Sequence, residues 1–536
     1  MKRVLPRVAL LIALAGCSRG NLDVVEWQPP DGGGSAYDGG PIEYDAAIEY
    51  DAAGDASSLP SDASSLPSDA SSPPSDASSP PSDASSPPSL EDLQRAYVDL
   101  RFGMLIHFGI LTYTGNWSDA NLPIEQFNPT KLDTTQWANA AVAAKMKYAI
   151  MSVRHIDGFA LWNTATTDFD VGSIGWRSGK GDVVREFVDA FRARGLKVGF
   201  LYSMWDATQG LGNSGVGNTL ITRPQIDYLK AQLTELLSNY GAISYVLFTG
   251  WAWQMGHNAV PYQEIRELVK SLQPNCLVFD QTQLMNLWDV DATLYDETWG
   301  VTSPAANTVP STQMQKINGN GGNDWFWDTD IGGLMTATDI VQNHLQILEG
   351  RWTNFLLNCP PNRDGLLDTA MVDILTRVGS IWNPDLSRKP LPSQGPQNDH
   401  PYTPVDATAT SGNATNAIDG VDTYNVYSVW QSSGSLPQSI TLDLGIERAD
   451  VGILNYVPRY AGRESANTDG AITSYAILTS KNGSSFAVAT TGTWPSSVAM
   501  KTAVFGPVAA RYVRLEARSA TGNSAAATEI SVGARR

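Results

Sequence analysis

Histidine, carboxylate and aromatic side chains follow short apolar runs in the middle of this 536-residue chain. His107 and His155 each follow such a run, Tyr202 ends another, and Asp296 and Glu297 follow a further one. Imidazoles and carboxylates bind hydroxyl groups and move protons, while aromatic rings stack on the apolar face of a sugar ring. This combination of side chains indicates a binding site for a carbohydrate.

Alternating strands and helices must position these side chains. From about residue 91 to residue 392 the pattern predicts a parallel α/β barrel of the (β/α)8 type, with a doubly wound sheet as the alternative. In a barrel, chemistry gathers where the strands end and the following loops begin. The predicted strands are 103–109, 148–153, 196–202, 243–248, 277–280, 292–295, 325–327 and 353–358, and the predicted helices are 134–147, 183–194, 224–240, 261–272, 340–349 and 369–381.

The last part of the chain, residues 401–536, has an all-β pattern. Short alternating runs at 439–444, 475–479 and 512–516 are separated by Gly, Asn and Ser. This pattern is typical of a β-sandwich. We expect residues 390–399 to link the sandwich to the barrel.

The first residues resemble a bacterial export signal. Basic residues precede an apolar stretch that is too short for a comfortable membrane span. The sequence Leu14-Ala-Gly-Cys17 resembles a lipobox, which implies a signal peptide at 1–16 and a lipid on the Cys17 thiol; an ordinary cleaved signal is the alternative. Because no Asp follows Cys17, the resemblance to lipoproteins of Gram-negative bacteria implies anchoring in the outer membrane or at the cell surface, and otherwise secretion.

We expect residues 17–90 to form an extended, disordered tether. Residues 57–89 carry a near-perfect repeat, Ser-Ser-Leu/Pro-Pro-Ser-Asp-Ala, which has no apolar face to bury. Proline stiffens this repeat and aspartate makes it self-repelling. Residues 18–89 hold 13 acidic residues and one basic residue, and therefore most of the net charge of −19. No basic cluster in the chain suggests a nucleic-acid partner.

Four segments of the predicted barrel carry longer motifs. They are Arg101-Phe-Gly-Met-Leu-Ile-His-Phe-Gly109, Arg154-His-Ile-Asp-Gly-Phe-Ala-Leu-Trp162, Lys197-Val-Gly-Phe-Leu-Tyr-Ser203 and Thr353-Asn-Phe-Leu-Leu-Asn-Cys-Pro-Pro-Asn-Arg-Asp-Gly365. In this order they resemble the α-L-fucosidases of glycoside hydrolase family 29, over roughly residues 93–392. The resemblance implies an enzyme that releases L-fucose from fucosylated glycans, with no cofactor and no metal ion.

The resemblance also implies roles for particular residues. Family members use a retaining mechanism, in which a nucleophilic carboxylate and an acid/base carboxyl group lie about 5–5.5 Å apart. The acid/base is expected at Glu297 or Asp296, and Glu297 is preferred because its longer side chain reaches the glycosidic oxygen more easily. Such an acid needs a raised pKa. The residues expected to bind fucose are His107, His155 and Tyr202, with Trp117 and Trp251 nearby.

Thr249 is a departure from the family pattern. It stands where the Asp of a Phe-Asp-Gly motif, the family's nucleophile, is expected. A Thr hydroxyl is not ionised at neutral pH, so it neither stabilises an oxocarbenium ion nor readily forms a glycosyl intermediate. Asp280, at the end of the next strand, is the nearest alternative nucleophile. A second departure, Ile156 in place of the second His of a family pair, is expected to be tolerated.

The C-terminal region contains a second set of motifs. Ala417-Ile-Asp-Gly420, Trp430-Gln431, Asp443-Leu-Gly445 and Arg511-Tyr-Val-Arg-Leu515 resemble discoidin-like (coagulation factor type C) domains. Many relatives bind galactose or similar sugars, sometimes beside a structural calcium ion. The candidate sugar contacts are Trp430, Arg459 and Tyr460, and a purely structural role for this domain is the alternative.

The sequence therefore leaves two alternative functions. The first is an exported α-L-fucosidase with Glu297 as acid/base, and the second is a tethered glycan-binding protein that kept the pocket but lost hydrolysis. Thr249 favours the second function, whereas Asp296 and Glu297 favour the first. A structural surface protein explains the polar strand ends least well. The remaining cysteines, Cys276 and Cys359, are expected to be buried free thiols, with a disulfide in an oxidising compartment as the alternative.

Overall fold

The computed structural model describes residues 88–114, 123–211, 221–249, 262–280, 290–318, 325–329, 333–395, 397, 401–402, 404–419, 428–459, 467–497 and 500–535. The predicted signal peptide, Cys17 and nearly all of the predicted tether lie outside these residues, as do Trp117, Trp251 and Tyr460. None of the described helices is both long and apolar enough to cross a membrane.

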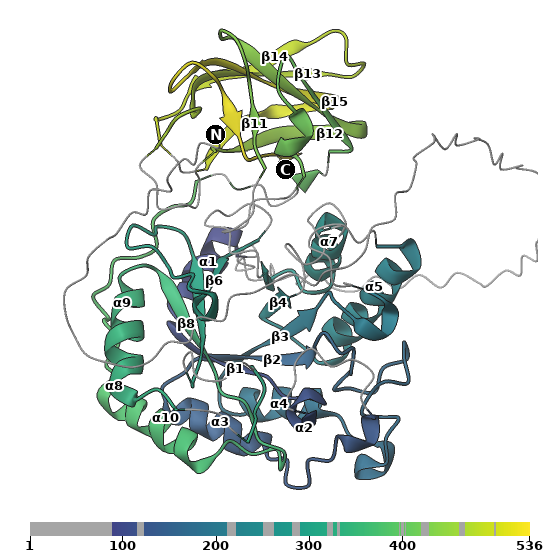
Figure 1. Cartoon of the computed structure of the whole chain (residues 1–536), viewed down its shortest axis with the longest axis vertical. Coiled ribbons are helices and arrows are strands. Elements are labelled where there is room, and N and C mark those ends of the chain that lie inside the picture. The colour runs from purple at the N-terminus through teal and green to yellow at the C-terminus, as the bar shows by residue number, and fades with distance from the viewer. Residues whose placement is uncertain are drawn as a thin grey trace, which may run out of the picture. The chain divides into compact units, whose positions relative to one another are not determined.

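In the described part of the chain, eight parallel strands form a nearly closed barrel, which confirms the predicted fold class (Figure 1). The strand order is β5-β4-β3-β2-β1-β8-β7-β6. The strands are β1 (Phe102–Ile106), β2 (Tyr148–Arg154), β3 (Lys197–Ser203), β4 (Tyr245–Thr249), β5 (Leu277–Asp280), β6 (Thr293–Asp296), β7 (Ser311–Lys316) and β8 (Thr353–Asn358).

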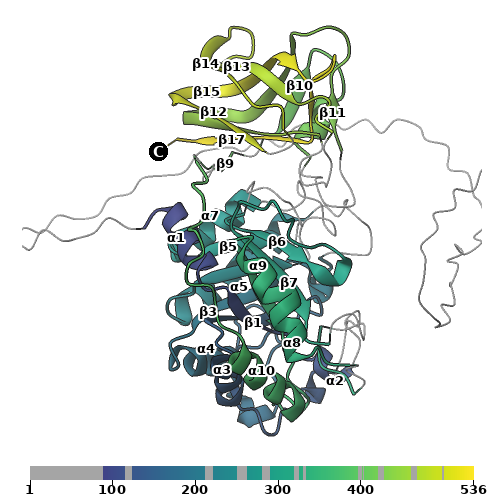
Figure 2. The ribbon, with the colours of Figure 1, turned by 90° about the vertical axis from the view of Figure 1, so that its left-hand side faces the viewer.

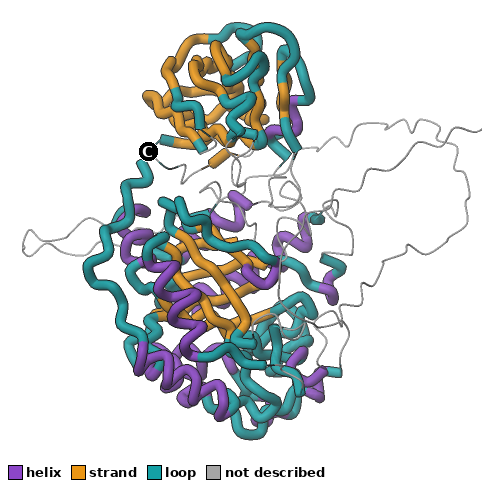
Figure 3. Tube along the Cα trace, turned by 60° about the vertical axis from the view of Figure 1, so that its left-hand side comes forward, coloured by secondary structure: helices purple, strands orange, loops and turns teal. Residues whose placement is uncertain are grey.

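Helices surround the strands of the barrel (Figure 3). The Asp133 and Asp182 side chains accept hydrogen bonds from backbone N–H groups of the first turns of α3 and α4, so both helices begin at a capping carboxylate. The α-helices are α1 (Leu90–Val98), α2 (Leu111–Thr114), α3 (Thr134–Ala143), α4 (Val183–Arg192), α5 (Arg223–Asn239), α7 (Tyr262–Leu272), α8 (Ala337–Asp339), α9 (Gln346–Glu349) and α10 (Thr369–Ile381). Short 3-10 turns η1 (Ile124–Gln126), η2 (Trp176–Gly179), η3 (Ala207–Gln209) and η5 (Glu297–Trp299) and the π-helical turn η6 (Ile340–Leu345) complete this layer.

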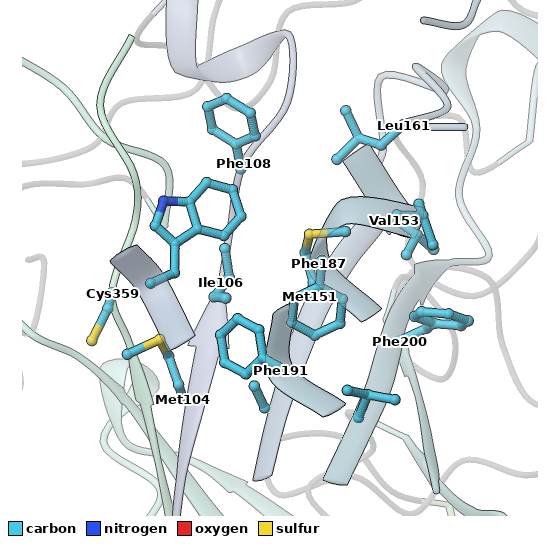
Figure 4. Close-up of a cluster of buried hydrophobic side chains, with 14 of the residues drawn as sticks. Met104, Ile106, Phe108, Met151, Val153, Leu161, Phe187, Phe191, Phe200 and Cys359 are labelled. Atoms are coloured by element: carbon cyan, nitrogen blue, oxygen red, sulfur yellow. The ribbon is translucent and has the colours of Figure 1, made fainter. Parts of the chain in front are cut away.

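The barrel has two separate apolar cores, one on each face of the sheet. Because side chains alternate along a strand, each residue belongs to one core or the other. The outer core packs strand residues such as Met151 and Phe200 near Phe187 and Phe191 of α4 (Figure 4). The inner core fills the barrel with Leu105, Ile150, Leu201, Leu247, Leu294, Met314 and Leu356, among others. A residue's position relative to these side chains therefore shows whether it faces the barrel interior.

A buried carboxylate links β5 and β6, the two strands at the ends of the strand order. In the described part of the barrel no ladder pairs β5 with β6, but the Asp291 backbone N–H donates to the Val278 carbonyl (2.9 Å), and the Val278 N–H donates to Asp291 Oδ2 (2.8 Å). Arg266 and Lys270 of α7 contact the same carboxylate at 2.5 and 2.6 Å. The Asp291 side chain thus substitutes for part of a strand ladder.

The predicted seventh strand is wrong. Residues 325–327 form a loop, and β7 is Ser311–Lys316, a largely polar run that is buried along its whole length. Its polar groups are satisfied by neighbouring side chains: the Thr312 hydroxyl lies 2.5 Å from the Tyr97 hydroxyl, and the Ser311 hydroxyl 2.7 Å from that of Thr293. An apolar pattern cannot reveal a strand whose burial depends on such distant partners.

The C-terminal part is an antiparallel β-sandwich, as predicted (Figure 2). One sheet has the order β14-β13-β15-β12-β17-β9, with β10 also paired to β12, and β11 pairs with β16. The strands are β9 (Pro401–Tyr402), β10 (Asp406–Ala409), β11 (Trp430–Gln431), β12 (Gln438–Val457), β13 (Ile472–Ser480), β14 (Ala487–Thr493), β15 (Lys501–Ala520), β16 (Ala526–Ala527) and β17 (Glu529–Ala534).

Candidate active site at the carboxyl end of the barrel

Thr249 is the last residue of β4 and faces the barrel interior. Leu247, two residues earlier, belongs to the inner core, so Thr249 lies on the same face of the strand. It pairs in register with Ser203 of β3 and is 9% exposed. The structure therefore presents a hydroxyl at the inner end of β4, where the family pattern leads us to expect a carboxylate.

The register of β5 argues against Asp280 as a substitute nucleophile. Residue 280 pairs with Phe248, whose side chain packs in the outer core. Position 280 therefore belongs to the opposite face of the sheet from Thr249.

Two imidazoles lie together at the carboxyl ends of β1 and β2. The ring centroids of His107 and His155 are 5.5 Å apart, and the rings meet edge to face. Trp325 lies 5.2 Å from His107, and Phe326 lies 5.3 Å from His107 and 5.1 Å from His155. We call these four residues the imidazole cluster. It gives a candidate sugar site both hydrogen-bonding groups and apolar walls.

Asn358 fixes the proton on His107. The Asn358 Nδ2 amide donates to the Trp325 carbonyl (2.7 Å), so its Oδ1 faces His107 Nδ1 at 2.9 Å. An amide oxygen only accepts, so His107 Nδ1 carries the proton and Nε2 is left as an acceptor. Burial lowers the pKa of His107 to about 4, although the hydrogen bond to Asn358 opposes this. His107 is therefore neutral at physiological pH and suited to accept a hydrogen bond from a hydroxyl.

His155 is also neutral. Burial, and then the charges of His107 and Arg154, lower its pKa well below the usual value. Its Nδ1 atom is buried and has no hydrogen-bond partner among the described residues, while the residue as a whole is half-buried. Both family-motif histidines thus lie in one cluster. Their binding of fucose stays a prediction.

A buried ion pair holds the loop that carries His155. Arg154, at the end of β2, pairs with Asp206 in the loop after β3, and both side chains are fully buried. Asp206 also accepts from the Tyr228 hydroxyl of α5 (2.9 Å). Gly158 has φ of +88°, and a Cβ atom there would lie 2.4 Å from Asp206 Oδ1, so only glycine fits. The motif Arg154-His155 therefore combines a structural cation with a candidate ligand-binding imidazole.

The predicted sugar contact of Tyr202 is contradicted by its placement. Tyr202 belongs to the outer core, is fully buried, and donates its hydroxyl to Gln232 of α5 (2.8 Å). Leu201, the preceding residue, is the one that faces the barrel interior. The spacing of the motif marked the strand end correctly but not the face.

Asp296 and Glu297 have different environments. Asp296 shares the inner face with Leu294, but it is fully buried and its Oδ1 accepts from the Thr298 backbone N–H (3.0 Å) and from the Thr298 hydroxyl. It therefore caps η5. The Glu297 side chain remains 22% exposed, so of the two carboxylates it is the one with solvent access.

The Glu297 carboxylate is hydrogen-bonded to side chains of β7 and η6. It lies 3.1 Å from His344 Nε2 and accepts from the Gln313 amide at 2.7 Å. Gln313 pairs with Phe355, an outer-core residue, so this carboxylate is directed away from the barrel interior. Burial alone would raise the pKa of Glu297, but the hydrogen bond and charge of His344, with the Gln313 amide, leave it below the usual value. The raised pKa expected of the acid is therefore not present in this arrangement.

The sandwich residues predicted to contact a sugar also differ in their environments. Trp430 is fully buried in the sandwich core and its Nε1 donates to the Ser411 carbonyl (2.8 Å), so its predicted sugar contact is wrong. Arg459 is half-buried and donates to Gln431 Oε1 (3.1 Å). Arg459 is thus the one of the three candidates that the structure both describes and leaves partly exposed.

No metal site is visible in the described part of the chain. No group of three or more His, Cys, Asp or Glu side chains among the described residues is placed to hold a metal ion. The calcium ion suggested for the sandwich stays a prediction. Cys276 and Cys359 are buried free thiols, as expected. Burial raises the pKa of Cys276 to about 12, which makes it unreactive as a thiolate.

Sequence comparison decides the family. The model of the α-L-fucosidase family matches residues 75–383, more than half of the chain. The chain belongs to the α-L-fucosidase family. A model of the F5/8 type C domain matches residues 403–530, which confirms the discoidin-like resemblance of the C-terminal part.

The match to each family relative covers only part of this chain and part of the relative. Alpha-L-fucosidase 1 of Arabidopsis thaliana is 32% identical over 311 residues, which are 53% of this chain and 59% of the relative. Putative alpha-L-fucosidase 1 of Oryza sativa subsp. japonica is 26% identical over 359 residues, 64% of this chain and 67% of the relative. The chain therefore spans roughly 60% of the length of the Arabidopsis relative.

Solved structures of fucosidases are similar at lower identity. A putative alpha-L-fucosidase from Bacteroides thetaiotaomicron is 22% identical with a TM-score of 0.47, over 84% of this chain and 97% of the other. A Ruminococcus gnavus family 29 fucosidase in complex with fucose is 16% identical with a TM-score of 0.46, over 83% and 95%. The family assignment rests on the sequence match.

Proposed function

We propose that this protein binds terminal α-L-fucosyl groups of glycans at the imidazole cluster and hydrolyses them slowly by a retaining mechanism. The observation that carries the proposal is the pair of neutral imidazoles, His107 and His155, walled by Trp325 and Phe326 at the carboxyl end of the barrel. A neutral imidazole accepts a hydrogen bond from a sugar hydroxyl, and the aromatic walls suit the apolar face and methyl group of fucose.

In this proposal Glu297 is the acid/base and Thr249 limits the rate. Glu297 is favoured over Asp296 because it keeps solvent access, whereas Asp296 is committed to the cap of η5. Thr249 places a neutral hydroxyl where positive charge develops on the sugar, so the carboxylate's stabilisation is missing. By analogy with other covalent enzymes, loss of a nucleophile lowers the rate by a factor on the order of 10⁶.

A fucose-binding protein without turnover is the second candidate. Two observations favour it: Thr249 faces inward on β4, and residue 280 lies on the outer face of the sheet. In that case the histidines would bind fucose and no group would attack the anomeric carbon.

An assay of wild-type protein beside Thr249→Asp and Thr249→Ala separates the candidates. An aryl α-L-fucoside reports turnover, and calorimetric titration with L-fucose reports binding. We expect both variants to bind fucose and Thr249→Asp alone to gain several orders of magnitude in kcat. If the wild type already turns over at about 1–10³ s⁻¹, typical of enzymes, the assigned role of Thr249 fails. If none of the three binds or cleaves fucose, the proposed substrate is wrong.

We further propose a lipid anchor on Cys17 that holds the protein at the outer membrane or cell surface. The support is the lipobox-like Leu14-Ala-Gly-Cys17 sequence. Labelling with a radioactive fatty acid should mark the wild type and not Cys17→Ala, and equal labelling of both would contradict the anchor.

We propose a carbohydrate-binding role for the sandwich that depends on Arg459. Arg459 is half-buried and donates a hydrogen bond to Gln431. Glycan-array binding should weaken in Arg459→Ala and persist in Arg518→Ala, which changes an arginine of the same domain that pairs with Glu516. Equal binding by both variants would remove Arg459 from the role.

A further inference from the structure

His344 lies in a π-helical turn beside the predicted acid/base. The turn η6 (Ile340–Leu345) stands between α8 and α9. Single π turns inside helices occur often at functional sites, because they redirect a side chain out of the regular helical pattern. His344 is 6% exposed, and its ring stacks on Phe355 of β8, with ring centroids 4.7 Å apart. The imidazole is therefore held in one place against the barrel wall.

The hydrogen-bond partners of His344 determine where its protons are. Nδ1 lies 3.3 Å from the Asp339 carbonyl oxygen, which only accepts, so Nδ1 carries a proton. Nε2 lies 3.1 Å from Glu297 Oε1. The bond between Nε2 and a carboxyl oxygen needs one further proton, which sits on either the imidazole or the carboxyl group. His344 and Glu297 therefore share one proton.

Gln313 holds the other side of the same carboxyl group. The Ser303 backbone N–H donates to Gln313 Oε1 (2.8 Å), which fixes the amide so that its Nε2 donates to Glu297 Oε2 (2.7 Å). Among the described residues, Glu297 and Asp339 are the titratable groups that act on His344, since Gln313 of β7 and Phe355 of β8 are uncharged. Burial would lower the pKa of His344, but the hydrogen bond and charge of Glu297 raise it above the usual value.

We propose that His344 is a positioning residue that stores the proton of the acid/base. The inference rests on the proposed fucosidase function. The proton moves from Nε2 to Glu297 Oε1, leaving a neutral imidazole with its proton on Nδ1 and a neutral carboxylic acid. This transfer removes both charges of the ion pair that holds Glu297 on the outer face of β7, so the side chain is free to turn towards the sugar. Glu297 then protonates the glycosidic oxygen of the departing sugar.

The second half of the reaction returns the proton. In the first half the bond between the anomeric carbon and the glycosidic oxygen breaks, its electron pair leaves with the oxygen, and the fucosyl group becomes an oxocarbenium ion. When a water molecule adds to the anomeric carbon of this ion, Glu297 takes one proton from that water and the oxygen becomes the product hydroxyl. The carboxylic acid passes the proton back to Nε2 of His344, and the ion pair re-forms. The protein ends the cycle with the same number of protons with which it began.

A titration of His344 in the full-length protein tests the coupling without any assay of activity. The ¹⁵N resonances of the imidazoles are followed with pH and assigned with His344→Gln. We expect His344 to titrate above the usual value of about 6.5 and to move down towards it in Glu297→Gln. Glu186→Gln, which changes a half-buried glutamate paired with Arg177, is the matched control and should leave the titration unchanged. Identical titrations in wild type and Glu297→Gln would overturn the proposal.

The pH dependence of kcat/KM tests the role in turnover, measured in the Thr249→Asp background if the wild type is too slow. The basic limb should move to lower pH by about one unit or more in both His344→Gln and His344→Phe, a tenfold loss at a fixed pH on that limb. His344→Gln can keep the hydrogen bond to Glu297 but cannot store a proton, so an unmoved limb in this variant overturns the proposal. No turnover in either background overturns the proposed function instead, and the titration of His344 distinguishes that result from a failure of the coupling.

Discussion

Removal of the Asp291 charge should weaken the contact between β5 and β6 and so destabilise the barrel. Asp291→Asn keeps the shape of the side chain but removes its charge. Arg266 and Lys270 then lose their shared carboxylate, and the Val278 N–H faces an amide in place of a carboxylate. We expect the folded state to lose the neutralisation of two cations and to keep at most a neutral seam hydrogen bond, from the Val278 N–H to the amide oxygen.

The expected loss follows from the burial of this cluster. The Asp291 side chain is 0% exposed, with Arg266 at 9% and Lys270 at 19%. At an effective dielectric constant of ~20, a charge pair 4 Å apart attracts by about 4 kcal/mol, and much of this offsets desolvation. Breaking a buried pair by removing one partner typically costs about 3–5 kcal/mol. We therefore expect the free energy of unfolding of the barrel to fall by about 3–5 kcal/mol.

Urea denaturation followed by tryptophan fluorescence measures this loss. Asp227→Asn is the matched control, since Asp227 pairs with Arg223 on the surface, where the two side chains are 58% and 56% exposed. The control should lie within about 0.5 kcal/mol of wild type. If Asp291→Asn also lies within that range, the seam does not depend on the carboxylate and the reasoning fails.

The same carboxylate predicts a dependence of stability on pH. Burial would raise the pKa of Asp291, but Arg266 and Lys270 hold it below the usual value. The stabilisation is therefore fully present above the unfolded value of about 3.9 and is lost as the pH falls through the lower folded value. The difference between wild type and Asp291→Asn should be constant from about pH 5 to 8 and should shrink in stronger acid. A difference that grows with acidity would contradict this sign.

Three other predictions test the site and the sandwich. Fucose affinity measured by calorimetry should be constant between about pH 5.5 and 8 and should fall as the pH approaches 4, because burial lowers the pKa of His107 to about 4 and a protonated ring no longer accepts a hydrogen bond from a hydroxyl. A tenfold fall in affinity between about pH 7 and 6 would show that another group controls binding. Tyr202→Phe should leave fucose affinity unchanged but lower the free energy of unfolding by about 1–3 kcal/mol, because the buried Gln232 loses its donor; loss of affinity with full stability would restore Tyr202 to the sugar site. Trp430→Ala should destabilise the sandwich by about 3–5 kcal/mol in a denaturation experiment, because it removes a fully buried core side chain; weaker glycan binding by a fully stable variant would show that Trp430 is a ligand contact after all.

The barrel was predictable because its signals are local. Apolar runs of strand length that alternate with helical patterns gave the correct type for seven of the eight strands, with ends within a few residues, and 277–280 and 353–358 match β5 and β8. The remaining strand, β7, was missed because Ser311–Lys316 is polar. Its burial is explained by partners such as Tyr97, which lies 215 residues away from Thr312 in the sequence. The sequence pattern within a strand gives no information about a partner so far away in the chain.

The face of each strand-end residue was decided by the tertiary structure. The sequence showed that Tyr202 and Thr249 end strands, but the barrel places Tyr202 in the outer core and Thr249 on the inner face. One residue of difference in position reverses the direction of a side chain, and predicted strand ends are uncertain by more than that.

The sequence by itself determined the family motifs, the alternation that builds the barrel, the sandwich pattern and the absence of an aspartate at position 249. Only the tertiary structure decided which protons and partners the site residues have. Asn358 orients His107 from 251 positions away, and His344 meets Glu297 across 47 positions. The pKa of each group depends on these contacts and on burial, which arise only when distant strands are brought together in the closed sheet.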